Sequence, residues 1–158
     1  MRLFSQDLSD GQTLPQAHVF NGMGYQGDNL SPQLQWEDAP AGTRSFVITC
    51  FDPDAPTGCG WWHWVVVNIP AEVTTIEQGA GSGVAALPAG ALQTRTDFGS
   101  SAYGGAAPPA GEKHRYVFTV HAMDTDKLDL SSDASGAMVG FNVHFHALAS
   151  ASLTVTFN

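Results

Sequence analysis

Two histidines are the residues of this chain best placed to do chemistry. His63 lies within the aromatic and β-branched run Trp61–Ile69, and His114 directly precedes a similar run, Arg115–Ala122. A Pro-rich segment comes shortly before each of them. An imidazole can donate N–H bonds to an anionic oxygen, and these bonds become stronger when the ring is protonated. The pattern alone also fits two structural histidines, so both interpretations stay open.

A carboxylate and a phenol belong to the same segments. Asp52 begins the Pro-rich segment Asp52–Pro56, and Tyr116 follows His114 by two residues on its strand. A carboxylate beside an imidazole favours the protonated ring and orients one of its nitrogens. We expect the two imidazoles, the carboxylate and the phenol to converge at one end of a β-sandwich.

Other motifs carry less weight. Gly22–Gly27 has the spacing of a dinucleotide fingerprint, but the turn-forming run Asp28–Pro32 follows it where a helix would be needed. A glycine-rich loop is therefore the better interpretation. His144 and His146 would share a face only on a strand, and no third ligand is near, so we predict no metal site and no cofactor.

Strand-like segments dominate the chain. The runs Ser45–Phe51, Trp61–Ile69, Arg115–Ala122 and Leu153–Phe157 are rich in β-branched and aromatic residues and are bounded by turn formers. Strict alternation along the second run predicts one face with Trp61, His63, Val65, Val67 and Ile69, and another with Trp62, Trp64, Val66 and Asn68. The predicted architecture is a mainly-β sandwich.

The segment from Ser135 to Ser150 fits two periods. Phe141, Val143 and Phe145 alternate with polar residues as on a strand, whereas Met138, Phe141, Phe145 and Leu148 form one helical stripe. Its length favours the helix, with Ser132 or Asp133 as the N-cap.

Composition limits the function classes. The chain has 158 residues, which suits a single domain, and six basic against 15 acidic side chains give a net charge of −9. This balance argues against nucleic acid and anionic lipid surfaces as partners. No apolar run approaches the roughly 20 residues of a membrane span, and no leader-like segment opens the chain, so we predict a cytoplasmic protein without membrane insertion. Cys50 and Cys59 are then expected to be free thiols.

Four blocks together resemble the phosphatidylethanolamine-binding protein family, in its compact bacterial, Raf kinase inhibitor-like branch. They are Gly27–Trp36, Asp52–Pro56, Trp62–Pro70 and the Gly-x-x-His-Arg-Tyr element from Gly111 to Tyr116. The resemblance runs over nearly the whole chain with the blocks in order. It implies a single domain over residues 1–158, a two-sheet antiparallel Greek-key β-sandwich with a few short helices, and one helix near the C-terminus over roughly Ala134–Ala147.

The resemblance also implies a small anion-binding pocket at one end of the sandwich. The Ala55–Pro56 bond at its edge is expected to be cis. Ala107 departs from the family's Gly-x-Pro-Pro loop, which raises the question of its backbone angles. The residues that match the family's pocket are Asp52, Pro56, Trp61, His63, Pro109, His114 and Tyr116.

Three functions follow as hypotheses. The favoured one is a binding protein, not an enzyme, that captures a phosphate-type anion such as a phospholipid headgroup. The second is an interaction protein that inhibits a kinase or protease, with the pocket as its regulatory site. The third is a hydrolase using His63, His114 and Asp52, which would need a nucleophile that the matching blocks do not contain. A homodimer is compatible with the low charge density of the chain.

Overall fold

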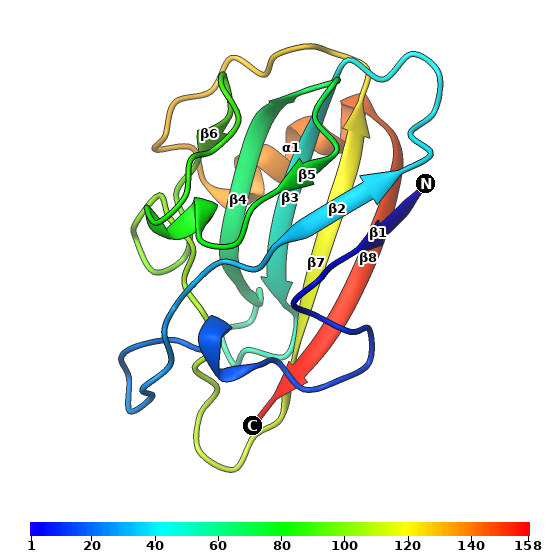
Figure 1. Ribbon diagram of the computed structural model, residues 1–158. Helices are drawn as coiled ribbons and strands as arrows, with labels where there is room; N and C mark the ends of the chain where they lie inside the picture. Colours follow the sequence, from blue (N-terminus) through cyan, green and yellow to red (C-terminus); the bar gives the residue numbers. More distant parts are fainter.

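Two antiparallel β-sheets pack face to face in the computed structural model, which describes residues 1–158 (Figure 1). The smaller sheet has the order β1 (Arg2–Phe4), β2 (Leu34–Glu37) and β5 (Thr75–Ile76). The larger sheet has the order β6 (Leu92–Gln93), β4 (Trp61–Pro70), β3 (Ser45–Asp52), β7 (His114–Met123) and β8 (Ala147–Phe157). The predicted two-sheet antiparallel sandwich is confirmed.

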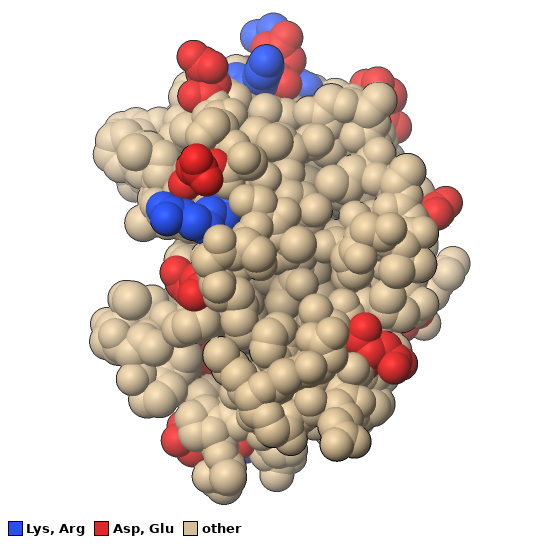
Figure 2. Space-filling model, turned by 90° about the vertical axis from the view of Figure 1, so that its left-hand side faces the viewer, with Lys and Arg blue, Asp and Glu red and all other residues tan.

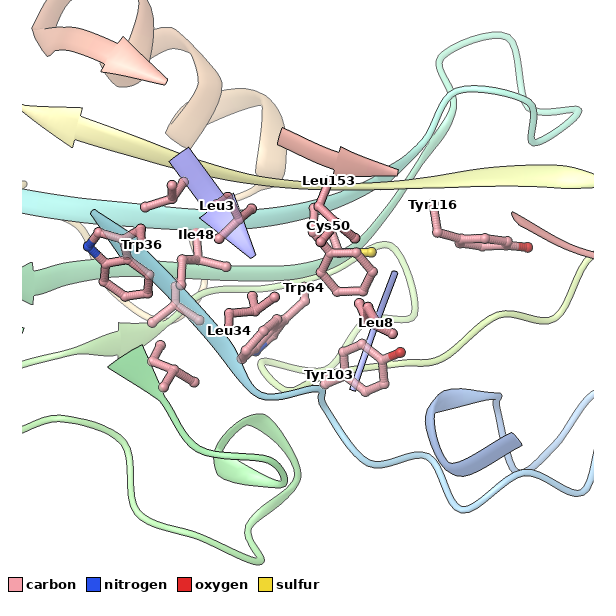
Figure 3. Close-up of a cluster of buried hydrophobic side chains, with 14 of the residues drawn as sticks. Leu3, Leu8, Leu34, Trp36, Ile48, Cys50, Trp64, Tyr103, Tyr116 and Leu153 are labelled. Atoms are coloured by element: carbon pink, nitrogen blue, oxygen red, sulfur yellow. The ribbon is translucent and has the colours of Figure 1, made fainter. Parts of the chain in front are cut away.

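The main core lies between the sheets and contains 22 buried residues. Leu34 and Trp36 of β2 face Ile48, Trp64 and other apolar residues of the larger sheet (Figure 3). Tyr116 lies at one end of this cluster, and its hydroxyl points away from the other core side chains. The core thus ends at a polar group, and the candidate site begins there.

One α-helix, α1 (Gly136–His146), covers part of the outer face of the larger sheet (Figure 1). It agrees with the predicted helix near the C-terminus, but its N-cap is Ser135, whose hydroxyl accepts from the Met138 N–H at 3.1 Å, and not Ser132 or Asp133. Two short 3₁₀ turns, Gln16–His18 and Ala80–Ser82, complete the helical content.

The outer face of α1 differs from its inner face. Val139 of α1 joins a second buried cluster under the helix, and a Cβ at Gly136 would lie only 2.5 Å from the Trp62 ring. The predicted helical stripe instead faces outward. Its large apolar side chains are 45% to 63% exposed: Met138, Phe141 and Phe145 on α1, and Leu148, which lies on β8 because the helix ends at His146.

Two register shifts between β3 and β4 overturn the predicted alternation of side chains along β4. Cys50 pairs with Trp64 and Phe51 pairs with Trp62, so His63 is an extra residue in the ladder. Such a bulge rotates the strand. His63 therefore lies on the same side as Trp64, facing Tyr116 of β7, and a second shift near Asn68 has a similar effect at the other end.

Candidate functional site

A cavity of about 220 Å³ opens at the end of the sandwich where β3 ends and where β4 and β7 begin. In an antiparallel ladder these strand ends share one edge, and Asp52 pairs directly with Trp61 there. All seven residues predicted for the pocket line this cavity: Asp52, Pro56, Trp61, His63, Pro109, His114 and Tyr116. Sequence reasoning missed the other lining residues: Met23, Ala55, Thr57, Phe98, Ala107 and Pro108.

His114 is held between two carboxylates. Its Nδ1 lies 2.7 Å from Asp52 Oδ2, and its Nε2 lies 2.8 Å from Glu112 Oε1. Burial alone would lower the pKa of His114, but the hydrogen bonds to Glu112 and Asp52 and the charges of both carboxylates outweigh it and raise the pKa above 6.5. Since each ring nitrogen faces a carboxylate oxygen, which accepts, both nitrogens donate and His114 is the cation of the site.

Asp52 also shapes the loop that follows β3. Its Oδ1 accepts the Asp54 N–H at 2.8 Å, and the Thr57 N–H donates to the Ala55 carbonyl at 2.8 Å across Pro56. No peptide bond in the protein is cis, so the predicted cis bond before Pro56 is wrong. The tight turn expected there is closed by these two hydrogen bonds with a trans bond.

Arg115 fixes the far side of the same loop. Its guanidinium and backbone N–H all donate to the Asp54 carboxylate, at 2.8 to 3.0 Å. The hydrogen bond from the Arg115 side chain is the main reason that the pKa of Asp54 falls to about 2. Arg115 therefore pairs with Asp54 and is not one of the residues that line the cavity.

His63 has the opposite electrostatic setting to His114. Its Nδ1 lies 2.8 Å from the Gly104 carbonyl, which can only accept, so Nδ1 carries the proton. Burial lowers the pKa of His63, although the bonds to Gly104 and Gly105 and the charge of Asp52 partly oppose this. The ring is neutral near pH 7 and Nε2 is then an acceptor. We therefore correct the expectation that both histidines donate to a bound anion.

Two buried donors beside the cavity have no partner within the protein: the Tyr116 hydroxyl and the Trp61 Nε1–H. Tyr116 is only 2% exposed, and burial followed by the charge of Asp52 raises the pKa of its phenol, which keeps it protonated. Tyr103 of the same core differs, since its hydroxyl donates to the His18 carbonyl at 2.7 Å. Of the four buried side-chain atoms without a partner, only these two belong to residues that line the cavity, where an acceptor on a ligand would satisfy them.

Aromatic rings and loop residues complete the walls. Phe98 lies edge-on to both Trp61 and His63, with ring centroids 5.4 Å apart in each pair. Ala107 lines the pocket, and neither Ala107 nor Ala106, which occupies the glycine position of Gly-x-Pro-Pro, has a positive φ, so the departure from glycine causes no strain. No sequence motif marked Phe98.

Neither cysteine lines the cavity. Both are free, as predicted, with Cys50 buried and Cys59 exposed. Burial and then the nearby charge of Asp52 raise the pKa of the Cys50 thiol, which makes the reactive thiolate rare. His144 and His146 lie on α1, where His146 contacts Asp124, so the strand-based metal pair is also ruled out.

Charged side chains are sparse on the face of the molecule that Figure 2 shows. Three of the six basic residues are already paired with acids, in Arg2–Glu37, Arg44–Asp126 and Arg115–Asp54. No basic patch of the kind that binds a phosphate backbone is formed. No helix has the length and apolar character that crossing a bilayer requires.

Comparisons with known proteins agree with this fold. Residues 4–158 match the family model described as phosphatidylethanolamine-binding protein, and the chain belongs to that family. It is 67% identical over 158 residues to the UPF0098 protein YbhB of Escherichia coli K12, with all of both chains covered. It is 49% identical over 152 residues to the UPF0098 protein YbcL of the same organism, covering 95% of this chain and 83% of the relative.

Solved structures give the same result. The crystal structure of Escherichia coli YbcL, described as a new member of the mammalian PEBP family, aligns with a TM-score of 0.96 at 46% identity and covers 99% of this chain and 97% of its own. The homologue CT736 from Chlamydia trachomatis aligns with a TM-score of 0.83 at 28% identity and covers 99% and 96% of the two chains. The predicted family membership is confirmed.

Proposed function

We propose that the protein binds a small anion with a phosphate-type group in the cavity at the end of the sandwich. The observation that carries the proposal is the pair of buried donors without partners, the Tyr116 hydroxyl and the Trp61 Nε1–H. An oxygen-rich ligand would accept from both, which removes the cost of leaving them unpaired.

The two histidines suit a phosphoryl group that carries one proton. His114 is the cationic donor, and neutral His63 offers the lone pair of Nε2 as an acceptor. A monoprotonated phosphoryl group has both P–O⁻ oxygens, which accept, and a P–OH, which donates. Sulfate has no such proton near neutral pH, so it would leave the His63 acceptor unpaired.

The remaining wall of the cavity is mostly apolar and is built from aromatic and proline side chains. A free ion would leave much of this wall in contact with water, whereas an ester would cover it. The proposal therefore includes a phosphomonoester, such as phosphoethanolamine, which is the free headgroup of a phospholipid, beside inorganic phosphate.

Binding is proposed in preference to catalysis. The lining contains neither serine nor cysteine, and the hydroxyl of Thr57 donates to the Gly60 carbonyl at 2.6 Å. Both nitrogens of His114 contact carboxylates, so His114 lacks the free lone pair of a general base. Kinase or protease inhibition, a homodimer and the cytoplasmic location stay as predictions from the sequence.

Calorimetric titration tests the proposal. Inorganic phosphate, phosphoethanolamine and sulfate would each be titrated into the protein at a pH near 6.5. We expect both phosphates to bind at least about tenfold more tightly than sulfate, which corresponds to one lost hydrogen bond. The exposed helical His144→Ala variant serves as a control and should bind like the wild type. Equal binding of phosphate and sulfate, or no binding of phosphate, would contradict the proposal.

A further inference from the structure

Glu112 occupies the outer nitrogen of His114. Its Oε1 lies 2.8 Å from Nε2, and Asp52 already holds Nδ1. The His114 side chain is only 3% exposed, whereas the Glu112 side chain is 46% exposed. The inner carboxylate is thus part of the core, and the outer one reaches the same ring from solvent.

A single turn connects Glu112 to the rim of the cavity. The Glu112 N–H donates to the Pro109 carbonyl at 3.0 Å, and Gly111 has φ of +84°. These features define a type II turn, in which glycine supplies the positive φ. The backbone of Glu112 is therefore fixed beside Pro109, and only its side chain needs to rotate to leave His114.

The charges around His114 explain why an anion and the Glu112 carboxylate would compete for Nε2. The imidazolium of His114 already faces two carboxylates, so the cluster of three groups has a net charge of −1. A third anion added to this cluster would meet net repulsion. An anion that replaces the Glu112 carboxylate on Nε2 leaves the count unchanged. A half-exposed ion pair contributes little to stability, so Glu112 is the partner that can be displaced.

We propose that Glu112 is an internal competitor for the anion site, so that its carboxylate covers Nε2 of His114 and must leave before a phosphate-type ligand binds there. This inference rests on the proposed function and adds its regulation. The apparent affinity equals the intrinsic affinity reduced by the fraction of molecules in which Glu112 has left. If Glu112 is docked about 90% of the time, its removal tightens binding about tenfold.

Two substitutions at this position and one control elsewhere separate docking from simple repulsion. Glu112→Ala removes both the charge and the contact. Glu112→Asp keeps the charge but is one methylene shorter, so it does not reach Nε2 from the same backbone position. Glu77→Gln removes an exposed carboxylate outside the cavity lining and controls for net charge.

The experiment is calorimetric titration of inorganic phosphate into the wild type and the three variants, with the His114 Nε2–H resonance followed by NMR. We expect Glu112→Ala and Glu112→Asp to bind phosphate about tenfold more tightly than the wild type, and Glu77→Gln to match the wild type. We also expect the His114 resonance to differ between the free wild type and free Glu112→Ala, and to coincide at saturating phosphate.

The possible contrary results distinguish a failure of the competitor role from a failure of the proposed function. Equal or weaker binding by Glu112→Ala would overturn the competitor role while leaving the proposed function intact. Tighter binding by Glu112→Ala alone, with Glu112→Asp like the wild type, would replace docking by long-range repulsion and overturn the proposal. No phosphate binding in any of the four proteins would overturn the proposed function and this inference together.

Discussion

The two histidine sites on either side of the cavity differ in the partner of Nδ1. His114 Nδ1 lies 2.7 Å from the Asp52 carboxylate, and His63 Nδ1 lies 2.8 Å from the neutral Gly104 carbonyl. Both rings are buried, at 3% and 4% exposure. The pKa is nevertheless raised for His114, against the effect of burial, and lowered by burial for His63. The hydrogen bonds and charges of Glu112 and Asp52 raise the pKa of His114, whereas burial lowers that of His63, whose Nδ1 partner is a neutral carbonyl.

The largest expected effect comes from removing the charged partner. Asp52→Ala should lower the free energy of unfolding by about 3 kcal/mol, because a buried imidazolium loses its inner carboxylate. Chemical denaturation measures this. The exposed Asp124–His146 pair has a nearly identical contact of 2.8 Å, with side chains 47% and 41% exposed. Asp124→Ala should cost less than about 1 kcal/mol. Similar losses in the two variants would refute the role of burial.

Ligand affinity gives the next largest effect. His114→Ala should weaken phosphate binding roughly 10- to 150-fold, because one charge-assisted hydrogen bond is lost. His146→Ala removes an exposed histidine on α1 and should bind like the wild type. Calorimetry on both variants decides the matter. Unchanged affinity in a folded His114→Ala protein would show that His114 is structural.

The two buried tyrosines differ in whether the hydroxyl has a partner within the protein. Tyr116→Phe removes a hydroxyl without a protein partner, so the free energy of unfolding should stay the same or rise by up to about 1 kcal/mol. Tyr103→Phe leaves the buried His18 carbonyl unpaired and should cost about 1–2 kcal/mol. Thermal or denaturant unfolding compares the two. A larger loss for Tyr116→Phe than for Tyr103→Phe would mean that the Tyr116 hydroxyl has a structural role.

The smallest effect is a pH dependence of stability. Since the folded pKa of His114 lies above the ordinary value of 6.5, its pairing stabilises the protein fully below that value and is lost as pH rises through the folded pKa. The stability advantage of the wild type over His114→Gln should therefore shrink as the pH rises from about 6.5 into the alkaline range. The pKa values of His63 and His121 are lowered, that of His121 to about 4, so protonating these residues in acid costs stability. Both residues are present in the wild type and in the variant, so this cost cancels in the comparison. Urea denaturation across this range checks the sign, and an advantage that grows with pH would contradict it.

The strand patterns of the sequence were enough to predict the architecture, and its resemblance to the family supplied seven of the 13 residues that line the pocket. The β-branched and aromatic runs of β3, β4 and β7 are local patterns, and a strand's alternation needs only neighbouring residues to be recognised. The Asp-Pro-Asp block and the Gly-x-x-His-Arg-Tyr element lie where strands end or begin, and antiparallel pairing brings such ends to one edge. The helix near the C-terminus followed from length and from the resemblance.

Only the tertiary structure decided the charge and orientation of the two imidazoles. The bulge at His63 depends on how β4 pairs with Cys50 and Phe51 of β3, which alternation along β4 alone does not contain. The partners of the rings, Gly104 and Asp52, are 41 and 62 residues away in the chain. Since a histidine's protonation follows from the groups that the fold places against its nitrogens, the sequence identified both rings but the packing assigned their opposite roles.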